Sequence, residues 1–211
     1  MLPDWAIAVF LALCLTIFAC VNLCNSKRFS ASKKRGRYRA EVRQPSGSIF
    51  ILAALGTLIF FLESTLYIIL VLTGRYGILS GFFFQLQFPL RSWLQLVGIF
   101  ITTFGYALFL WSVLARGRYA TSWEMPENQK LVTWGPYRYV RHPSYLAYFI
   151  LFAGLFFILL NLIAVIPFIA ILGYVRMTIV EEELLTRRFG EAYLEYQRAT
   201  GKFLPRRKQQ G

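Results

Sequence analysis

Side chains that commonly carry out catalysis are scarce in this sequence of 211 residues. It has one histidine, His142, and three cysteines, Cys14, Cys20 and Cys24, which all lie in the first apolar run. A single histidine cannot build a multi-histidine metal site, and no pattern of His, Asp or Glu accompanies the cysteines. The motifs GxSxG and HExxH and a Gly-rich phosphate loop are also absent. The common hydrolase and oxidoreductase templates therefore do not apply, and we expect no metal site.

Charge is also scarce along four long stretches of the chain. Hydrophobic residues make up 57% of the sequence, against about 45–50% in a typical soluble domain. The stretches are Trp5–Ser26, Ile49–Gly74, Ser92–Ala115 and Ser144–Val175. The one charged residue that they contain is Glu63, in the second stretch. About 20 apolar residues cross a bilayer, so the chain is predicted to be an integral membrane protein. The first stretch lacks a basic leader and is too long for a signal peptide, so we expect a retained span.

The stretch Ser144–Val175 has two possible interpretations. As one helix it would be about 48 Å long, which exceeds the bilayer thickness. Asn161 lies near its middle, and a tight hairpin, with Ser144–Leu160 up and Leu162 to about Val175 down, fits better. With the hairpin, 21 of the 23 Lys and Arg residues fall on one side of the membrane; with a single helix the split is 13 to 10. Because basic loops stay in the cytoplasm, we predict five spans, with the N-terminus outside and the C-terminus cytoplasmic.

The net charge of +13 is therefore explained by basic loops on the cytoplasmic side of the membrane and by their attraction to anionic lipids. No nucleic-acid partner is expected. The fold class is an all-α integral membrane protein with a cytoplasmic C-terminal helix. We divide the chain into an N-terminal membrane region, 1–92, and a core, 93–211. The first region has two spans, a basic cytoplasmic connector and an apolar segment, 76–90, that is re-entrant or interfacial. The core has three spans, the RHPxY loop and a helix with consecutive glutamates.

The first polar cluster is the sequence GPYRYVRHPSY, residues 135–145. Pro143 fits the first turn of the following helix, so Arg141 and His142 lie just before a helix N-terminus at the membrane surface. Free backbone N–H groups at such a position favour an anion such as a carboxylate. The alternative is that the arginine and tyrosine side chains only anchor the span among the headgroups.

The second cluster is EEELLTRRFGEAYLEY, residues 181–196. Three consecutive carboxylates near an anionic membrane need a cation, either the neighbouring Arg187 and Arg188 or a bound cationic ligand. The hairpin starts and finishes on one membrane face, so it brings His142 close to Glu181 and Glu182. A sulfonium-bearing amino acid such as S-adenosylmethionine suits such a pocket, because aromatic faces attract cations.

The sequence from Lys130 to Pro205 resembles the isoprenylcysteine carboxyl methyltransferase family, which is grouped with phospholipid N-methyltransferases. The RHPxY element and the EExxL…FGxxYxxY element carry the resemblance, in this order and separated by the hairpin. The resemblance implies an S-adenosylmethionine pocket between the last two spans and the C-terminal helix. The residues expected to bind the cofactor are Tyr137, Arg141, His142, Tyr145, Glu181 and Glu182.

Two positions depart from the family pattern. Asn128-Gln129 stands where many relatives have Gly-His, and Ala147 stands where many have glycine. The first departure puts in doubt whether the loop 121–130 binds cofactor in the usual way. The first 90 residues carry no family signature, and acceptor specificity is expected to lie there.

The expected reaction is methyl transfer to a lipophilic, isoprenylcysteine-like carboxylate at the boundary between membrane and cytosol. Such a carboxylate needs no general base, and we expect Arg176, at the end of the last span, to orient it through paired hydrogen bonds. Alternatively, Arg176 only anchors the span. Glu63 either lines an entry route for the lipid or bonds to a neighbouring helix. The competing functions are phospholipid N-methylation, a sterol-type reductase and an inactive membrane scaffold.

Overall fold

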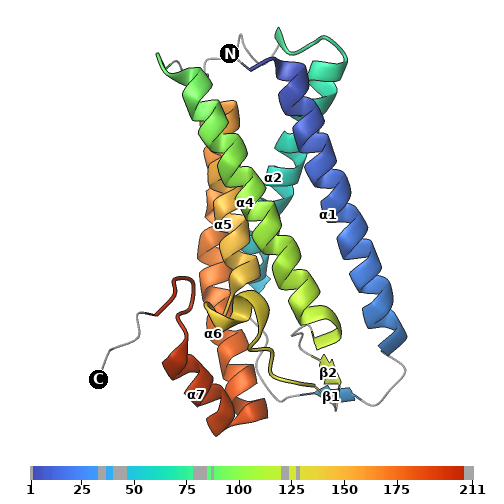
Figure 1. The fold of residues 1–211 in the computed structure, drawn as a ribbon, viewed down its shortest axis with the longest axis vertical. Coiled ribbons are helices and arrows are strands. Elements are labelled where there is room, and N and C mark those ends of the chain that lie inside the picture. The colour runs from blue at the N-terminus through green and yellow to red at the C-terminus, as the bar shows by residue number, and fades with distance from the viewer. Residues whose placement is uncertain are drawn as a thin grey trace.

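A computed structural model describes residues 2–32, 37–39, 47–77, 85–86, 88–119, 124–126 and 129–206 of the chain. Long helices run nearly along one direction and form a bundle (Figure 1). Four of them are long and apolar enough to cross a membrane: Asp4–Asn25 within α1 (Asp4–Ser32), α2 (Gly47–Leu72), α4 (Arg91–Arg116), and the segment Leu162–Phe189. The helix α5 (Pro143–Leu159) is apolar but shorter, with 17 residues. The prediction of an all-α multi-pass membrane protein is confirmed, with four spans by length and one shorter helix.

The segment Ser144–Val175 forms a hairpin and not one long helix. The chain turns at Leu160, which takes the left-handed conformation with φ of 48°. The side chain of Asn161 accepts a hydrogen bond of 2.8 Å from the backbone N–H of Ile163 and so begins the short 3-10 helix η3 (Leu162–Phe168). An asparagine that caps the next helical segment explains why the turn falls here.

The returning helix is longer than the sequence indicated. α6 runs without interruption from Ile169 to Phe189, and a separate helix α7 covers Glu191–Ala199. Gly190, with φ of 55°, separates the two. The expected C-terminal helix carrying both Glu181 and Tyr196 is therefore wrong: the glutamates extend the last apolar helix, and only the later part of the motif lies on α7.

Small residues allow the helices to approach closely. A Cβ atom added at Gly154 of α5 would lie 2.2 Å from the Thr102 hydroxyl oxygen of α4, and one at Gly173 of α6 would lie 2.5 Å from the Ala53 backbone nitrogen of α2. Lipid tails give no hydrophobic drive between helices, so close backbone packing of this kind is a main source of their association. Two tight helix pairs, α4 with α5 and α2 with α6, thus fix the position of the hairpin.

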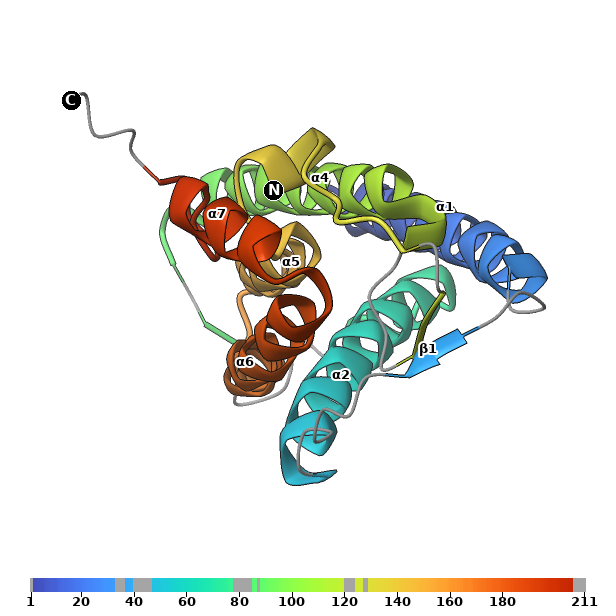
Figure 2. The same ribbon diagram turned by 90° about the horizontal axis from the view of Figure 1, so that it is seen from below.

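Three basic parts of the chain meet at one end of the bundle. The strand β1 (Arg37–Arg39) pairs antiparallel with β2 (Glu124–Pro126), and α7 lies beside the start of α5 at this end (Figures 1 and 2). The three groups of basic residues thus lie on one side, as the hairpin predicted. That this side faces the cytosol stays a prediction. Parts of the basic connector, 33–36 and 40–43, and most of the segment 76–90 lie outside the described residues.

Candidate functional site

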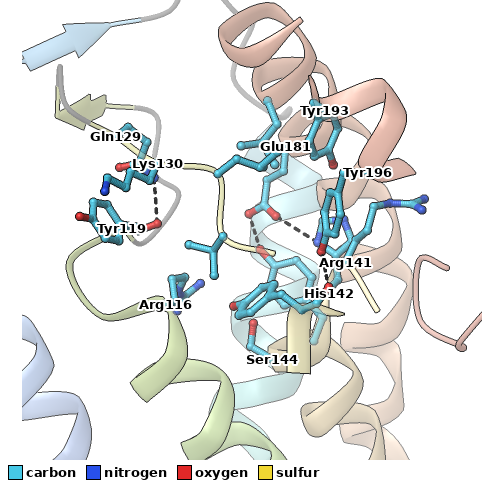
Figure 3. Close-up of a pocket in the computed structure, with 15 residues that line it drawn as sticks. Arg116, Tyr119, Gln129, Lys130, Arg141, His142, Ser144, Glu181, Tyr193 and Tyr196 are labelled. Carbon is cyan, nitrogen blue, oxygen red and sulfur yellow. Dashed lines mark hydrogen bonds and ion pairs between the residues drawn. The ribbon is translucent and has the colours of Figure 1, made fainter. Parts of the chain in front are cut away.

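A pocket of about 580 Å³ lies at this end of the bundle, between the last turn of α4, the start of α5, the outer half of α6, and α7 (Figure 3). The pocket is lined by Arg116, Tyr119, Gln129, Lys130, Leu131, Val132, Tyr137, Arg141, His142, Ser144, Tyr145, Glu181, Leu185, Tyr193 and Tyr196. Of the six residues expected to bind cofactor, all except Glu182 lie on this lining.

A charged cluster forms one wall of the pocket. Arg141 donates from Nε to the Glu182 carboxylate at 2.8 Å, and both side chains are nearly buried, with 11% and 12% of their surface exposed. The Lys202 ammonium lies 3.5 Å from the other oxygen of Glu182, and the Gln197 side chain donates to that oxygen at 3.3 Å. A buried carboxylate is stable only when such partners replace its water. Glu182 thus lies behind the pocket wall, where it holds other side chains in place.

His142 lies between the two glutamates. Its Nε2 is 3.0 Å from Glu182 Oε1, and its Nδ1 is 3.5 Å from Glu181 Oε2. Burial by itself lowers the pKa of His142, but the hydrogen bonds and negative charges of Glu181 and Glu182 outweigh burial, and the pKa is raised. The ring therefore favours the imidazolium form. The cluster then holds three cations, Arg141, His142 and Lys202, against two carboxylates, and its net charge is positive.

Aromatic rings cover the other side of the histidine. The rings of His142 and Tyr145 stack with centroids 5.7 Å apart and planes 2° from parallel. The Tyr145 hydroxyl donates a hydrogen bond to Glu181 Oε1. Tyr137 is buried, and its backbone carbonyl accepts a 2.6 Å hydrogen bond from the hydroxyl of Tyr196. These rings make the inner surface of the pocket aromatic, next to the one carboxylate, Glu181, that lines it.

Backbone hydrogen bonds fasten the C-terminal segment to the start of α5. The Arg141 N–H donates to the Gly201 carbonyl at 2.9 Å, and the His142 N–H donates to the Lys202 carbonyl at 3.1 Å. The Arg141 guanidinium also donates to the carbonyls of Gln197 and Thr200 at the end of α7. The RHPxY loop is therefore held by α6 through side chains and by the C-terminal segment through the backbone. No pattern in the sequence indicated this second contact.

Arg116 is the pocket residue that sequence reasoning missed. It is the last residue of α4, its buried Nε has no hydrogen-bond partner in the described part of the chain, and no ion pair there includes it. From sequence it looked like one more basic residue at the end of a span. Gln129 also lines the pocket: it donates to the Tyr119 carbonyl at 2.8 Å, and its buried side-chain oxygen has no partner among the described residues. The loop 121–130, which departs from the family pattern, therefore borders the pocket at Gln129. Residues 120–123 and 127–128 lie outside the described residues.

Arg176 does not line the pocket, and its expected role in orienting the acceptor stays a prediction. The buried positions on this part of α6 are Gly173, Tyr174, Met177 and Thr178, and Arg176 lies on the exposed face between them. Glu181 follows Met177 by four residues and so shares the buried face. The helix thus places Arg176 on a different face from Glu181, and the pocket is lined instead by Arg116 at the end of α4.

Comparisons with known proteins find sequence similarity over about half of the chain. Residues 93–192 match the model of a family described as phospholipid methyltransferase. The chain is 32% identical over 119 residues to a protein-S-isoprenylcysteine O-methyltransferase of Xenopus laevis and 31% identical to the one of Homo sapiens. These alignments cover 54% of this chain and 41% and 42% of the relatives, so the chain spans less than half of their length in the match. A solved structure of the eukaryotic intramembrane Ras methyltransferase ICMT covers 78% of this chain and 54% of that one, with 25% identity and a TM-score of 0.48.

The bundle of apolar helices, with a polar and aromatic pocket at its end, is that of a multi-pass membrane protein. The RHPxY loop, the hairpin and the glutamate pair lie inside the matched region. Over about half of its length this chain is therefore similar to phospholipid methyltransferases and to isoprenylcysteine O-methyltransferases.

Proposed function

We propose that the protein transfers a methyl group from S-adenosylmethionine to the carboxylate of an isoprenylcysteine-like lipid acceptor, at the cytoplasmic boundary of the membrane. The observation that carries the proposal is the pocket in which Arg141 and His142 meet Glu181 across the hairpin, beside Arg116, whose buried Nε has no partner among the described residues. Anionic, cationic and aromatic groups converge on this one pocket. This combination suits a zwitterion that also carries a sulfonium.

The lining residues fit the methyl donor group by group. Glu181 can accept from an ammonium or a ribose hydroxyl, and the rings of Tyr137 and Tyr145 can face a sulfonium. The net positive cluster around Arg141 and His142 favours the carboxylate of the donor. When bound, S-adenosylmethionine supplies a methyl group on a positively charged sulfur. Glu182 contributes by positioning: it keeps Arg141 and His142 in place without occupying the pocket.

Arg116 is suited to hold the acceptor. It ends a membrane-crossing helix, so its guanidinium lies where the polar end of a lipid emerges from the bilayer. Because an arginine fork matches a carboxylate in two parallel hydrogen bonds, it can orient one carboxylate oxygen toward the transferred methyl group. An ionised carboxylate needs no base, and the residues around it need only orient it and exclude water. An amine acceptor, as in phospholipid N-methylation, would have to lose a proton first.

The proposal is tested by incubating the purified protein with labelled S-adenosylmethionine and three separate acceptors: a prenylcysteine, a phospholipid and a sterol. We expect label only in the prenylcysteine, as a base-labile ester. Label in the phospholipid headgroup would instead establish N-methylation. A protein that binds a nicotinamide cofactor and transfers no methyl group would be a reductase, and one that binds neither would be a scaffold.

Binding of S-adenosylhomocysteine tests the site separately from the acceptor. Glu182→Ala or His142→Ala should weaken this binding by about 1–3 kcal/mol, the usual cost of losing a buried hydrogen bond to a charged group. Glu183→Gln is the matched control, because Glu183 is half exposed and pairs with Arg187 on the outer face of α6. Unchanged affinity in both pocket variants would remove the site.

A further inference from the structure

A second cavity, of about 480 Å³, lies where the hairpin turns, at the other end of α5 from the methyl-transfer pocket. The length of α5, about 25 Å, separates the two ends. The cavity is lined by Glu63, Leu66, Tyr67, Tyr76, Gln85, Leu159, Asn161, Ile163 and Ala164, none of which lines the first pocket. It is therefore a separate space. It also does not lead to the methyl-transfer pocket, so the expectation that Glu63 lines an entry route to that pocket finds no support here.

Glu63 is the unusual group in this cavity. Both of its carboxylate oxygens are buried, and neither has a hydrogen-bond partner within the described part of the chain. The alternative expectation, a hydrogen bond to a neighbouring helix, is thus not found among these residues. The adjacent Ser64 bonds to its own helix, at the Phe60 carbonyl. A carboxylate buried in a membrane span is costly without a partner, and such residues usually mark a binding site or pathway.

The remaining lining suits a small cation. The rings of Tyr67 and Tyr76 meet edge to face with centroids 5.4 Å apart, and tyrosine faces attract ammonium groups. The cavity is also held open by the hairpin turn, because the Gln85 side chain donates to the Leu159 carbonyl at 3.2 Å and Leu86 donates to the Leu160 carbonyl at 2.8 Å. The lining thus combines the rings of Tyr67 and Tyr76 with the carboxyl group of Glu63, whose oxygens have no partner among the described residues.

A cationic side chain and a lipid-facing side chain also lie at the cavity. Arg91, the first residue of α4, lies just outside the lining and hydrogen bonds to Tyr76, near the charge of Asp4, while its buried Nε has no hydrogen-bond partner among the described residues. Leu66, on the lining of the cavity, is 50% exposed on the outer surface of α2, where lipid tails lie in a membrane. A phospholipid with an ammonium group suits these surroundings. Its ammonium would pair with Glu63, its phosphate would lie near Arg91, and its acyl chains would pack beside Leu66.

We propose that this cavity binds the headgroup of an aminophospholipid, with Glu63 as the counter-ion of its ammonium and Arg91 near its phosphate. The primary ammonium offers three N–H donors to the two free oxygens of Glu63. The lipid enters from the leaflet opposite the methyl-transfer pocket. The proposal does not depend on the methyltransferase function.

The test compares lipid retention in nanodiscs made of equal amounts of phosphatidylethanolamine and phosphatidylglycerol with the same acyl chains. After gentle extraction, native mass spectrometry counts the lipids that stay with the full-length protein. We expect the wild-type protein to retain phosphatidylethanolamine over phosphatidylglycerol by about tenfold or more, because one charge-assisted hydrogen bond is lost in the second lipid. Glu63→Gln should abolish the preference, and Arg91→Gln should lower the retention of both lipids.

Arg75→Gln is the matched control, because Arg75 is an exposed arginine close to Tyr76 that does not line the cavity. It should behave as wild type. Circular dichroism and thermal unfolding establish that each variant is folded, without recourse to catalysis. Equal retention of the two lipids by the wild-type protein, or a preference that survives Glu63→Gln, would overturn the proposal.

Discussion

Glu182 shows how one buried carboxylate can organise a site that it does not line. Arg141, His142 and Lys202 all lie within 3.5 Å of its oxygens. Because these cations come from the start of α5 and from the segment after α7, a single side chain of α6 joins three parts of the chain. Glu181, one residue earlier, points into the pocket instead (Figure 3). Adjacent residues on one helix therefore take different roles, one facing the ligand space and one fixing its wall.

The raised pKa of His142 predicts a pH-dependent stability. A group whose pKa is higher in the folded protein stabilises it fully below its unfolded value, about 6.5, and the contribution is lost as pH rises through the folded value. The melting temperature of the wild-type protein should therefore exceed that of His142→Gln most at about pH 6, and the difference should shrink toward about pH 9. Thermal unfolding in detergent measures it. A difference that grows with pH would show that the imidazolium between Glu181 and Glu182 is not stabilising.

Arg116, the last residue of α4, and Arg176, within α6, should differ in their effect on turnover. Arg116→Ala should leave S-adenosylhomocysteine affinity nearly intact and lower the rate with a prenylcysteine, whereas Arg116→Lys should rescue only partly, since a point charge cannot reproduce the planar fork. Arg176→Ala is the matched comparison, because Arg176 is exposed and outside the pocket. If Arg176→Ala slowed turnover and Arg116→Ala did not, the original expectation for Arg176 would be restored.

At the residue scale, the sequence identified side chains whose neighbours could be inferred from the hairpin. His142 and the glutamates were placed together because a hairpin returns its ends to one face. Arg116 was not, since its position depends on the close packing of α4 against α5, which no local pattern encodes. The exposed position of Arg176 could not be predicted, because the end of a span fixes the depth of a residue in the membrane but not the direction in which it points around the helix.

At the scale of elements, charge counts predicted the hairpin and its turn near Asn161, while the boundary between α6 and α7 was missed. The apolar run ends near Val175, so a new helix was expected there. Helix formation does not require apolar residues, and Glu181–Arg188 are good helix formers that extend α6 until Gly190. The hydrophobic pattern thus marks where the membrane ends and not where the helix ends.

The packing of α4 against α5 should depend on Gly154. Gly154→Ala places a methyl group 2.2 Å from the Thr102 hydroxyl oxygen, and overpacking of this kind typically costs about 1–3 kcal/mol. We expect a lower melting temperature, together with weaker S-adenosylhomocysteine binding, because α5 begins directly after Arg141 and His142. Gly47→Ala is the control, since nothing lies within 4 Å of a Cβ atom there. Equal melting temperatures for the two variants would show that the helices are free to separate slightly.

For the whole molecule, the structure places the basic segments at one end of the bundle, and the positive-inside rule assigns that end to the cytosol. Single cysteines at Lys130 and Lys202, in a variant without Cys14, Cys20 and Cys24, should resist a membrane-impermeant reagent added outside intact cells. A cysteine at Thr73, beyond the opposite end of α2, should react. The reverse pattern would invert the orientation, and labelling of Lys130 and Lys202 on different sides would contradict the bundle itself.

The short strand pair also has a kinetic consequence. β2 lies between Tyr119 and Gln129, two residues of the pocket wall, and β1 belongs to the connection between α1 and α2. The strand pair therefore connects this part of the wall to the N-terminal half of the chain, whose described residues do not line the pocket. A ligand that enters or leaves past this wall must carry the strand pair with it or separate the strands. Changes in the α1–α2 connection should thus alter residence time more than affinity.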